Sequence, residues 1–154
     1  MIIILQATNN DISAILQIRT NNLSVDIINQ RLSDQTKGIS DFLVLEADSQ
    51  IVSFVVLRWT GKNTHPEYPD MVDLYTKTEE RGKGYGTALI VECENRAKSR
   101  GYKKIGLAVN PNLNDHARKL YEKLGYVHDG GKSYIDGVYD GIDDWCVDLE
   151  KELK

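Results

Sequence analysis

The chain has 154 residues, of which 41% are hydrophobic and 27% are charged, values that suit a single globular domain spanning residues 1–154. Its formal net charge of −4 argues against a nucleic-acid-binding protein, whose affinity comes mainly from neutralised phosphates. No apolar run approaches the roughly 20 residues that a membrane span needs. We therefore expect neither a nucleic acid nor a membrane as partner.

The N-terminal half of the chain alternates strand-like and helix-like patterns. Its first strand is apolar but lacks the basic leader of a secretion signal. Asp48-Ser49-Gln50 separates two β-rich runs, as in a hairpin, and glycine, asparagine and proline then indicate a loop. The predicted elements are a strand at 2–7, helices at about 11–19 and 23–32, strands at 42–45 and 51–57, and a loop at 59–68.

The C-terminal half continues the alternation and contains a glycine-rich loop at 81–86. The predicted elements are strands at 71–76 and 104–109, a helix from the glycine-rich loop to about 100, a helix at 112–124, a strand opening at 126–127, a loop at 129–144 and a last strand at 145–149. This order predicts an α/β (α+β) fold in which about four helices cover a mixed sheet of six to seven strands.

The two cysteines, Cys93 and Cys146, form no metal-spaced pair and are too few for a disulfide scaffold. We expect reduced thiols that pack as small apolar side chains, and a cytoplasmic protein.

Charge is unevenly distributed along the chain. Residues 77–104 carry eight Lys or Arg against four Glu, whereas residues 129–152 carry eight Asp or Glu against two Lys. A basic middle could meet a phosphorylated ligand and an acidic end could attract a cationic acceptor. Two solvated faces explain the same pattern equally well.

The glycine-rich loop Arg81-Gly82-Lys83-Gly84-Tyr85-Gly86 lies between a predicted strand and a predicted helix. Free N–H groups of a first helical turn bind anions, and glycines let a phosphate approach the backbone. A P-loop would need Gly-Lys-Ser/Thr, and a dinucleotide fingerprint would need a glycine where Thr87 stands. The remaining pattern, R-x-x-G-x-G, fits a loop that holds the pyrophosphate of coenzyme A, with a ligand-free tight turn as the alternative.

A second motif follows at 114–126 and reads N-x-x-A-x-x-L-Y-x-x-L-G-Y. Together, the two motifs resemble those of the GNAT superfamily of N-acetyltransferases over about residues 71–127. Two spaced motifs in the correct order are more specific than either alone. The resemblance implies a mostly antiparallel sheet in which the strands at 71–76 and 104–109 splay apart at the cofactor site.

The resemblance also implies roles for individual residues. The strand at 74–76 would pair its backbone with the pantetheine arm, N–H groups at 82–87 would hold the pyrophosphate, and Asn114 would contact the pantetheine. Asn114 and Tyr121 are seven residues apart, which places them on one helix face about 10.5 Å apart along the axis. The implied cofactor-binding residues are Leu74, Tyr75, Thr76, Arg81, Gly82, Lys83, Gly84, Tyr85, Gly86, Thr87, Asn114, Ala117 and Tyr121.

The implied reaction is acetyl transfer from acetyl-CoA to a primary amine, by direct attack on the thioester and without a metal. Tyr121 is the candidate acid for the leaving thiolate, although a tyrosine at this spacing is also an ordinary core residue. Asp70 is the candidate base because histone-type members carry a glutamate there. The other base candidates are Asp73, Glu67 and Glu46, and all four can equally be plain surface carboxylates.

One departure narrows the family branch. The ribosomal-protein-acetylating branch carries a glutamate in the strand that follows the glycine-loop helix, where this chain has Ala108. Ala108 cannot act as a base, which counts against that branch.

Two alternatives to acetyl transfer are a non-catalytic acetyl-CoA sensor with the same fold and a transferase for a longer acyl group. The resemblance places the acceptor against the helices at 11–35 and the loops at 59–68 and 129–144. Aromatic residues in these loops could frame a cationic amine, or could instead reflect loop packing or a homodimer contact. These aromatics are Trp59, Tyr68, Tyr134 and Tyr139.

Overall fold

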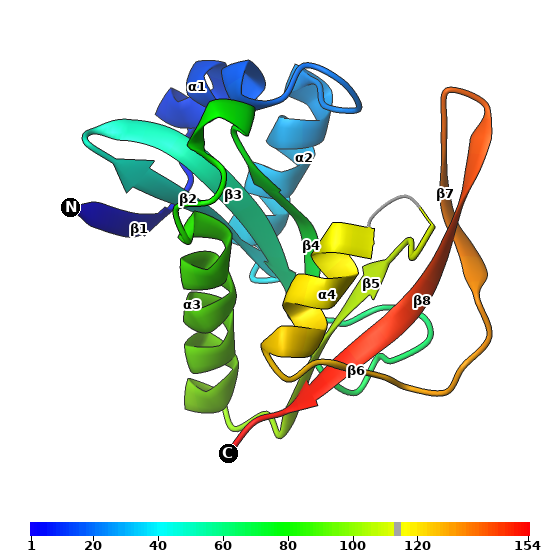
Figure 1. Cartoon of the computed structure of the whole chain (residues 1–154). Coiled ribbons are helices and arrows are strands. Elements are labelled where there is room, and N and C mark those ends of the chain that lie inside the picture. Colours follow the sequence, from blue (N-terminus) through cyan, green and yellow to red (C-terminus); the bar gives the residue numbers. More distant parts are fainter. Residues whose placement is uncertain (113–114) are drawn as a thin grey trace.

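The computed structural model describes residues 1–112 and 115–154. Four α-helices and eight β-strands follow one another along this part of the chain, joined by two short 3-10 turns at 9–11 and 78–80 (Figure 1). The elements are β1 Ile2–Gln6, α1 Ile12–Ile18, α2 Val25–Thr36, β2 Ser40–Ala47, β3 Gln50–Arg58, β4 Asp70–Thr76, α3 Tyr85–Ser99, β5 Lys104–Val109, α4 Asp115–Lys123, β6 Val127–His128, β7 Tyr134–Tyr139 and β8 Ile142–Glu152.

The strands form one twisted sheet in the order β1-β2-β3-β4-β5-β8-β6, and β7 pairs with β8 off this path. Strands β4 and β5 run parallel, and every other pairing is antiparallel. The structure thus confirms the predicted mixed, mostly antiparallel sheet with four helices, and it has one strand more than the six to seven expected.

Helices cover both faces of the sheet (Figure 1). Strand β2 shows why, because its side chains alternate between two apolar cores. Phe42 and Val44 join the core beneath α1 and α2, whereas Leu43 and Leu45 join the core beneath α3 and α4. Both faces of this central strand are therefore buried, which explains its nearly continuous apolar sequence.

Helix α3 follows directly from the glycine-rich loop and forms as its apolar spacing predicts. Leu89, Ile90, Cys93 and Ala97 recur every three or four residues and are fully buried. The helix stops before Gly101, whose φ of +86° is a left-handed conformation that favours glycine. Both cysteines are free and buried. Cys93 packs in the apolar core as expected, whereas Cys146 Sγ lies 3.4 Å from an oxygen of Asp144.

Strand β4 contains a bulge that separates it from β5. Its register against β3 shifts between Val72 and Tyr75, and Asp73 within this segment adopts a φ of +55°. Pairing with β5 is confined to Asp70 with Gly106 and Met71 with Leu107. Beyond Met71 the two strands diverge, so the edge of β4 that would face β5 is left without a strand partner. The predicted splay of these two strands is confirmed.

The region 129–144, expected as a loop, contains strand β7 and the start of β8. These two strands form a hairpin whose turn is Asp140-Gly141, with φ values of +53° and +77°. An Asp-Gly pair with two positive φ angles is the turn that joins two-residue hairpins. The loop prediction is therefore wrong, because it overlooked this turn signal.

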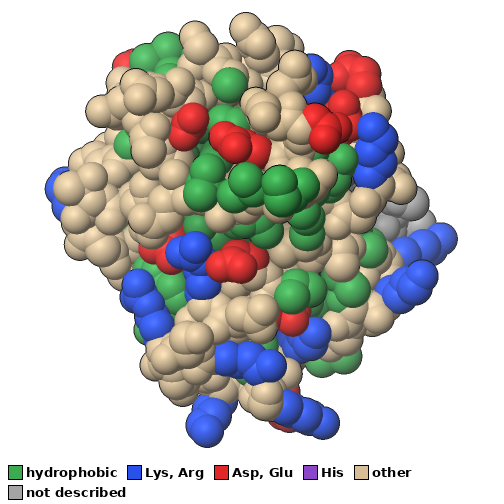
Figure 2. Space-filling view, turned by 90° about the vertical axis from the view of Figure 1, so that its left-hand side faces the viewer, with side chains coloured by type: hydrophobic (Ala, Val, Ile, Leu, Met, Phe, Trp, Pro, Cys, Tyr) green, Lys and Arg blue, Asp and Glu red, His purple; other side chains and the backbone are tan. Residues whose placement is uncertain are grey.

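Strand β1 forms one edge of the sheet and leaves several apolar side chains in solvent. Met1, Ile2, Ile3 and Leu5 are all exposed. Figure 2 shows a band of hydrophobic side chains across the face of the molecule on which β1 lies in Figure 1. Within the described residues, no helix is long and apolar enough to cross a membrane.

Candidate active site

The glycine-rich loop brings the N-terminus of α3 against the divergent part of β4. Gly82 and Gly84 have φ values of +82° and +85°, and Gly84 immediately precedes the helix. The first helical turn leaves N–H groups without intrahelical acceptors. A Cβ atom placed on Gly86 would lie 3.8 Å from Thr76 Oγ1 and 3.9 Å from Leu74 Cδ2, so this glycine keeps a narrow approach to the helix end open. The local chemistry therefore suits a bound anion.

The two cations of this loop have different environments. Arg81 donates from Nε to the carbonyl oxygen of Thr76 over 3.0 Å, and its guanidinium lies 5.0 Å from the centre of the Tyr75 ring. Lys83 is exposed and forms an ion pair of 2.6 Å with Glu80. Arg81 is thus held beside β4, whereas Lys83 points to solvent.

A groove of about 590 Å³ runs from the glycine-rich loop to α4. Most of the residues that the sequence predicted as cofactor-binding line it together. Lys83 does not line it, and Asn114 lies outside the described residues. The predicted residues in the lining are Leu74, Tyr75, Thr76, Arg81, Gly82, Gly84, Tyr85, Gly86, Thr87, Ala117 and Tyr121.

A second cavity of about 390 Å³ adjoins the groove and lies in the gap between β4 and β5. The two cavities have four lining residues in common: Leu74, Tyr75, Ala117 and Tyr121. Arg19 of the α1–α2 connection and Arg31 of α2 line one part of the second cavity, and residues of β7 and β8 line another. The two cavities therefore meet at the splay, with Tyr121 at their junction.

Tyr121 projects from α4, and its ring packs edge to face against Tyr126 with centroids 6.3 Å apart. Burial raises the pKa of its phenol above the ordinary value, so the phenol stays protonated at neutral pH. Tyr126 is fully buried and donates to Glu94 over 2.7 Å. Of these two tyrosines, only Tyr121 lines the two cavities, whereas Tyr126 lines neither of them.

The structure places Asp70 away from this junction. Its side chain is buried and lines neither cavity, and Lys62 Nζ lies 3.0 Å from one of its oxygens. Burial raises the pKa of Asp70 to about 6, partly offset by Lys62. Glu67 and Glu46 line neither cavity, while Asp73 lies in the second cavity but is held by Arg19 and Arg31. Of the four predicted base candidates, only Asp73 reaches the second cavity.

Two other carboxylates, which the sequence interpretation missed, do line the second cavity. Asp136 lies at the bulge in β7, and Asp144 lies on β8 at the corresponding level. Bulges commonly redirect a side chain towards a site. The Asp140-Gly141 turn signals the hairpin, but the hairpin pairs Gly137 with Asp144. The irregularity at Asp136, which no local sequence signal marks, brings this residue next to that pair.

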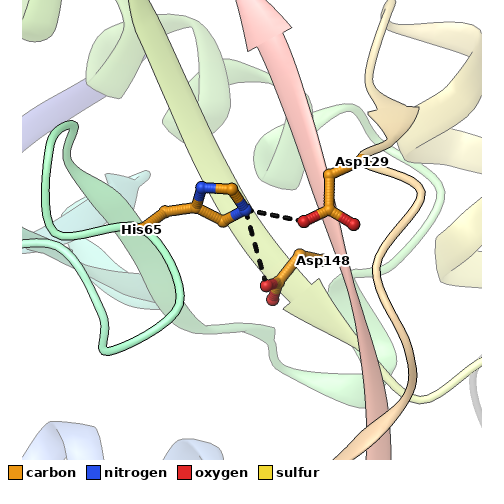
Figure 3. A group of neighbouring side chains, drawn as sticks. All are labelled: His65, Asp129 and Asp148. Carbon is orange, nitrogen blue, oxygen red and sulfur yellow. Dashed lines mark hydrogen bonds and ion pairs between the residues drawn. The ribbon is translucent and has the colours of Figure 1, made fainter.

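A separate polar cluster joins the β3–β4 loop to β8 and the segment after β6 (Figure 3). His65 Nε2 lies 2.6 Å from Asp129 and 3.8 Å from Asp148. The ligand atoms of these three residues lie within 4.8 Å of one another, close enough to hold a metal ion, and the same is true of Asp136, Asp144 and Cys146. However, Asp148 already accepts from Thr64 and Tyr134 and forms an ion pair with Lys62 over 2.9 Å. Protein donors thus satisfy this buried carboxylate without a metal.

The fold is similar to that of several solved acetyltransferases. An N-acetyltransferase from Staphylococcus aureus Mu50 aligns with a TM-score of 0.80 at 18% identity, covering 100% of this chain and 99% of that one. A putative acetyltransferase from Salmonella typhimurium, solved with acetyl-CoA, aligns with a TM-score of 0.78 at 16% identity, covering 100% and 95%. The paia N-acetyltransferase from Thermoplasma acidophilum, solved with coenzyme A, aligns with a TM-score of 0.71 at 19% identity, covering 99% of both chains. At these identities the likeness establishes the fold.

The sequence itself establishes the family. Residues 10–126 match the family described as Acetyltransferase (GNAT). The chain belongs to this family, and this membership supports acetyl transfer as its general activity.

Proposed function

We propose that this protein transfers an acetyl group from acetyl-CoA to a primary amine by direct attack on the thioester. The observation that carries the proposal is the junction of two cavities at Tyr121. The groove at the glycine-rich loop would bind the donor at the start of α3, and the second cavity, which charged residues line, would bind the acceptor. Since Arg19 and Cys146 line the same chamber, we take residues 1–154 as one catalytic unit.

The groove supplies what the donor's chemistry requires. The N–H groups at the start of α3 and the guanidinium of Arg81 would hold the pyrophosphate. The free edge of β4 after Met71 would pair with the amides of the pantetheine arm. A coenzyme A held at these two places would have its thioester at the junction of the cavities. Leu74, Tyr75, Ala117 and Tyr121 line both cavities there.

In the reaction, the neutral amine attacks the thioester carbonyl, a C–N bond forms and the C–S bond breaks. The leaving thiolate takes a proton, and Tyr121 is the proposed donor because its phenol remains protonated and lies at the junction. The amine loses a proton to a carboxylate of the second cavity or to water. We assign the carboxylate role to Asp136 and withdraw it from Asp70, which lines neither cavity.

The test is release of free thiol from acetyl-CoA with a panel of primary amines, comparing the intact protein with Tyr121→Phe. We expect turnover with at least one amine and a fall in kcat of about 100-fold in the variant, with coenzyme A affinity unchanged. Tyr126→Phe is the matched control, because Tyr126 donates to Glu94 and lines neither cavity. Tight acetyl-CoA binding with no turnover of any amine would favour a sensor, and no coenzyme A binding would refute the proposal.

A further inference from the structure

Two arginines converge on a single carboxylate in the second cavity. Both terminal nitrogens of Arg19 donate to Asp73, and Arg31 donates to the same carboxylate over 2.8 Å. All three side chains are largely withdrawn from solvent, with exposed fractions of 13%, 18% and 20% for Arg19, Arg31 and Asp73. Two positive charges therefore face one negative charge, and one excess positive charge lies in the wall of the cavity. Such a charge is costly without a counter-charge.

The two arginines differ in how many hydrogen bonds they donate to Asp73. The guanidinium of Arg19 lies 5.5 Å from the centre of the Phe54 ring and 5.1 Å from that of Tyr75, in addition to its paired bonds to Asp73. Arg31 lies 5.7 Å from the centre of the Phe42 ring and uses one terminal nitrogen for Asp73. Its other terminal nitrogen, like Nε of Arg19, is buried with no hydrogen-bond partner among the described residues. Buried donors without partners are rare and call for an explanation. Arg31 therefore makes fewer hydrogen bonds to Asp73 than Arg19 does, and it lines the same cavity.

Two other residues in the cavity lining, Asp136 and Asp144, are acidic. Asp144 accepts from Asn110 over 2.7 Å, and within the described chain Asp136 forms no ion pair. Burial and then the charge of Asp144 raise the pKa of Asp136, while Lys62 and Arg58 partly lower it. Asp136 and Asp144 thus place two carboxylates on the lining of the cavity that Arg19 and Arg31 also line.

From this charge distribution we infer that the acceptor is an amino-acid-type zwitterion, whose carboxylate binds at Arg31 and whose amine lies towards Asp136 and Asp144. A cavity of about 390 Å³ falls in the range of small-molecule sites, roughly 300–1,000 Å³. The carboxylate would supply the missing negative charge and accept a hydrogen bond from the terminal nitrogen of Arg31 that has no partner among the described residues. This inference rests on the proposed function, because it takes the second cavity as the acceptor site.

A binding experiment tests the inference without requiring turnover. We would measure thermal unfolding in saturating coenzyme A with a panel of α-amino and ω-amino acids, each paired with its carboxamide. The carboxamide keeps the amine and the shape but removes the negative charge. We expect at least one amino acid to raise the Tm in a concentration-dependent way, with an apparent Kd about tenfold or more below that of its carboxamide.

Variants of one residue locate the contact. Arg31→Gln should abolish the preference for the acid over the carboxamide, and Arg31→Lys should retain part of it because the charge remains. Lys37→Gln is the matched control, since it removes one positive charge from the exposed end of the same helix. The preference should survive in that variant.

The outcomes separate this inference from the proposed function. Equal binding of amino acids and carboxamides, no binding of any panel member, or an unchanged preference in Arg31→Gln would each overturn it. Acetylation of carboxamides and simple amines as efficient as that of the amino acids would also overturn it while supporting the transferase. Amino-acid binding that depends on Arg31, with no thiol release, would support the inference and count against the proposed reaction.

Discussion

The side chain of Arg81 donates from Nε to the backbone carbonyl oxygen of Thr76, a contact of 3.0 Å between the glycine-rich loop and the last residue of β4. Thr76 ends the strand segment that has no partner on its β5 side, and Arg81 opens the loop that leads into α3. This contact holds the proposed pyrophosphate site and the proposed pantetheine edge in a fixed relation. Changes at Arg81 should therefore affect donor binding more than stability.

Arg81→Gln is expected to raise the Kd for coenzyme A by about tenfold or more, because a hydrogen bond to a charged group contributes roughly 1.5–3 kcal/mol. Isothermal titration calorimetry at fixed ionic strength measures it. Lys83→Gln removes the same charge from the same loop, but this lysine is exposed and paired with Glu80, so its effect should be smaller. Equal losses in the two variants would mean that only the net charge of the loop matters.

Gly84→Ala and Gly86→Ala should separate folding from donor binding. Gly84 has a φ of +85°, and a side chain in the left-handed region costs about 1–2 kcal/mol, so Gly84→Ala should lower the free energy of unfolding in urea. Gly86 lies in α3, and its added methyl group would meet only ordinary contacts of 3.8 and 3.9 Å. Gly86→Ala should therefore gain up to about 1 kcal/mol of stability.

The same Gly86→Ala variant should bind coenzyme A more weakly, since the methyl group narrows the groove at the helix start. A variant that is at least as stable as the parent but impaired in donor binding would identify this glycine as a ligand contact. Unchanged coenzyme A affinity in Gly86→Ala would contradict the proposed path of the donor.

Asp70→Asn should mainly lower the stability of the protein, whereas Asp136→Asn should mainly lower its activity. Asp70 is buried against Lys62, and removing one partner of a buried ion pair costs about 3–5 kcal/mol, so Asp70→Asn should lower the Tm and leave kcat largely unchanged. Asp136→Asn should leave the Tm nearly unchanged, lower kcat/KM and remove the acidic limb of its pH profile. Thiol release and thermal unfolding, measured on both variants, test which aspartate acts as the base. A large loss of kcat in a folded Asp70→Asn protein would restore Asp70 as the base.

His65 should make stability depend on pH. Burial by itself would lower the pKa of His65, but hydrogen bonds to Asp129 and Glu67 and their charges outweigh it and raise the pKa above 6.5. A raised folded-state pKa stabilises the protein fully below the unfolded value, and this stabilisation is lost as the pH rises through the folded value. The difference in unfolding free energy between the parent and His65→Gln should therefore be largest near pH 5.5 and shrink by pH 8.

The carboxylate partners of His65 do not contribute to the pH dependence between pH 5.5 and 8. Asp129 and Glu67 have lowered pKa values, so their contributions to stability are lost only under more acidic conditions than pH 5.5. His128→Gln serves as the control, because that imidazole is 37% exposed. A pH-independent difference for His65→Gln would show that the ring acts only through packing on Tyr68, whose ring lies 5.0 Å away.

The amino-acid sequence was sufficient for those features that depend on neighbouring residues. Apolar spacing placed α3 and the central strands, and glycine placed the end of that helix, because backbone conformation and amphipathic period are local properties. The paired motifs at 81–86 and 114–126 identified the family, which the match over residues 10–126 confirms. Even the missed hairpin had a local signal in Asp140-Gly141.

The tertiary structure alone decided which charged side chains meet. Asp70 and Asp73 are three residues apart, yet the bulge in β4 places Asp73 in the second cavity with Arg19 and Arg31, while Asp70 pairs with Lys62. Asp136 and Asp144 reach the same cavity from β7 and β8. Arg19 and Asp73, for example, are 54 residues apart along the chain. Such contacts depend on strand register and helix packing over the whole sheet, so no local pattern in the sequence determines them.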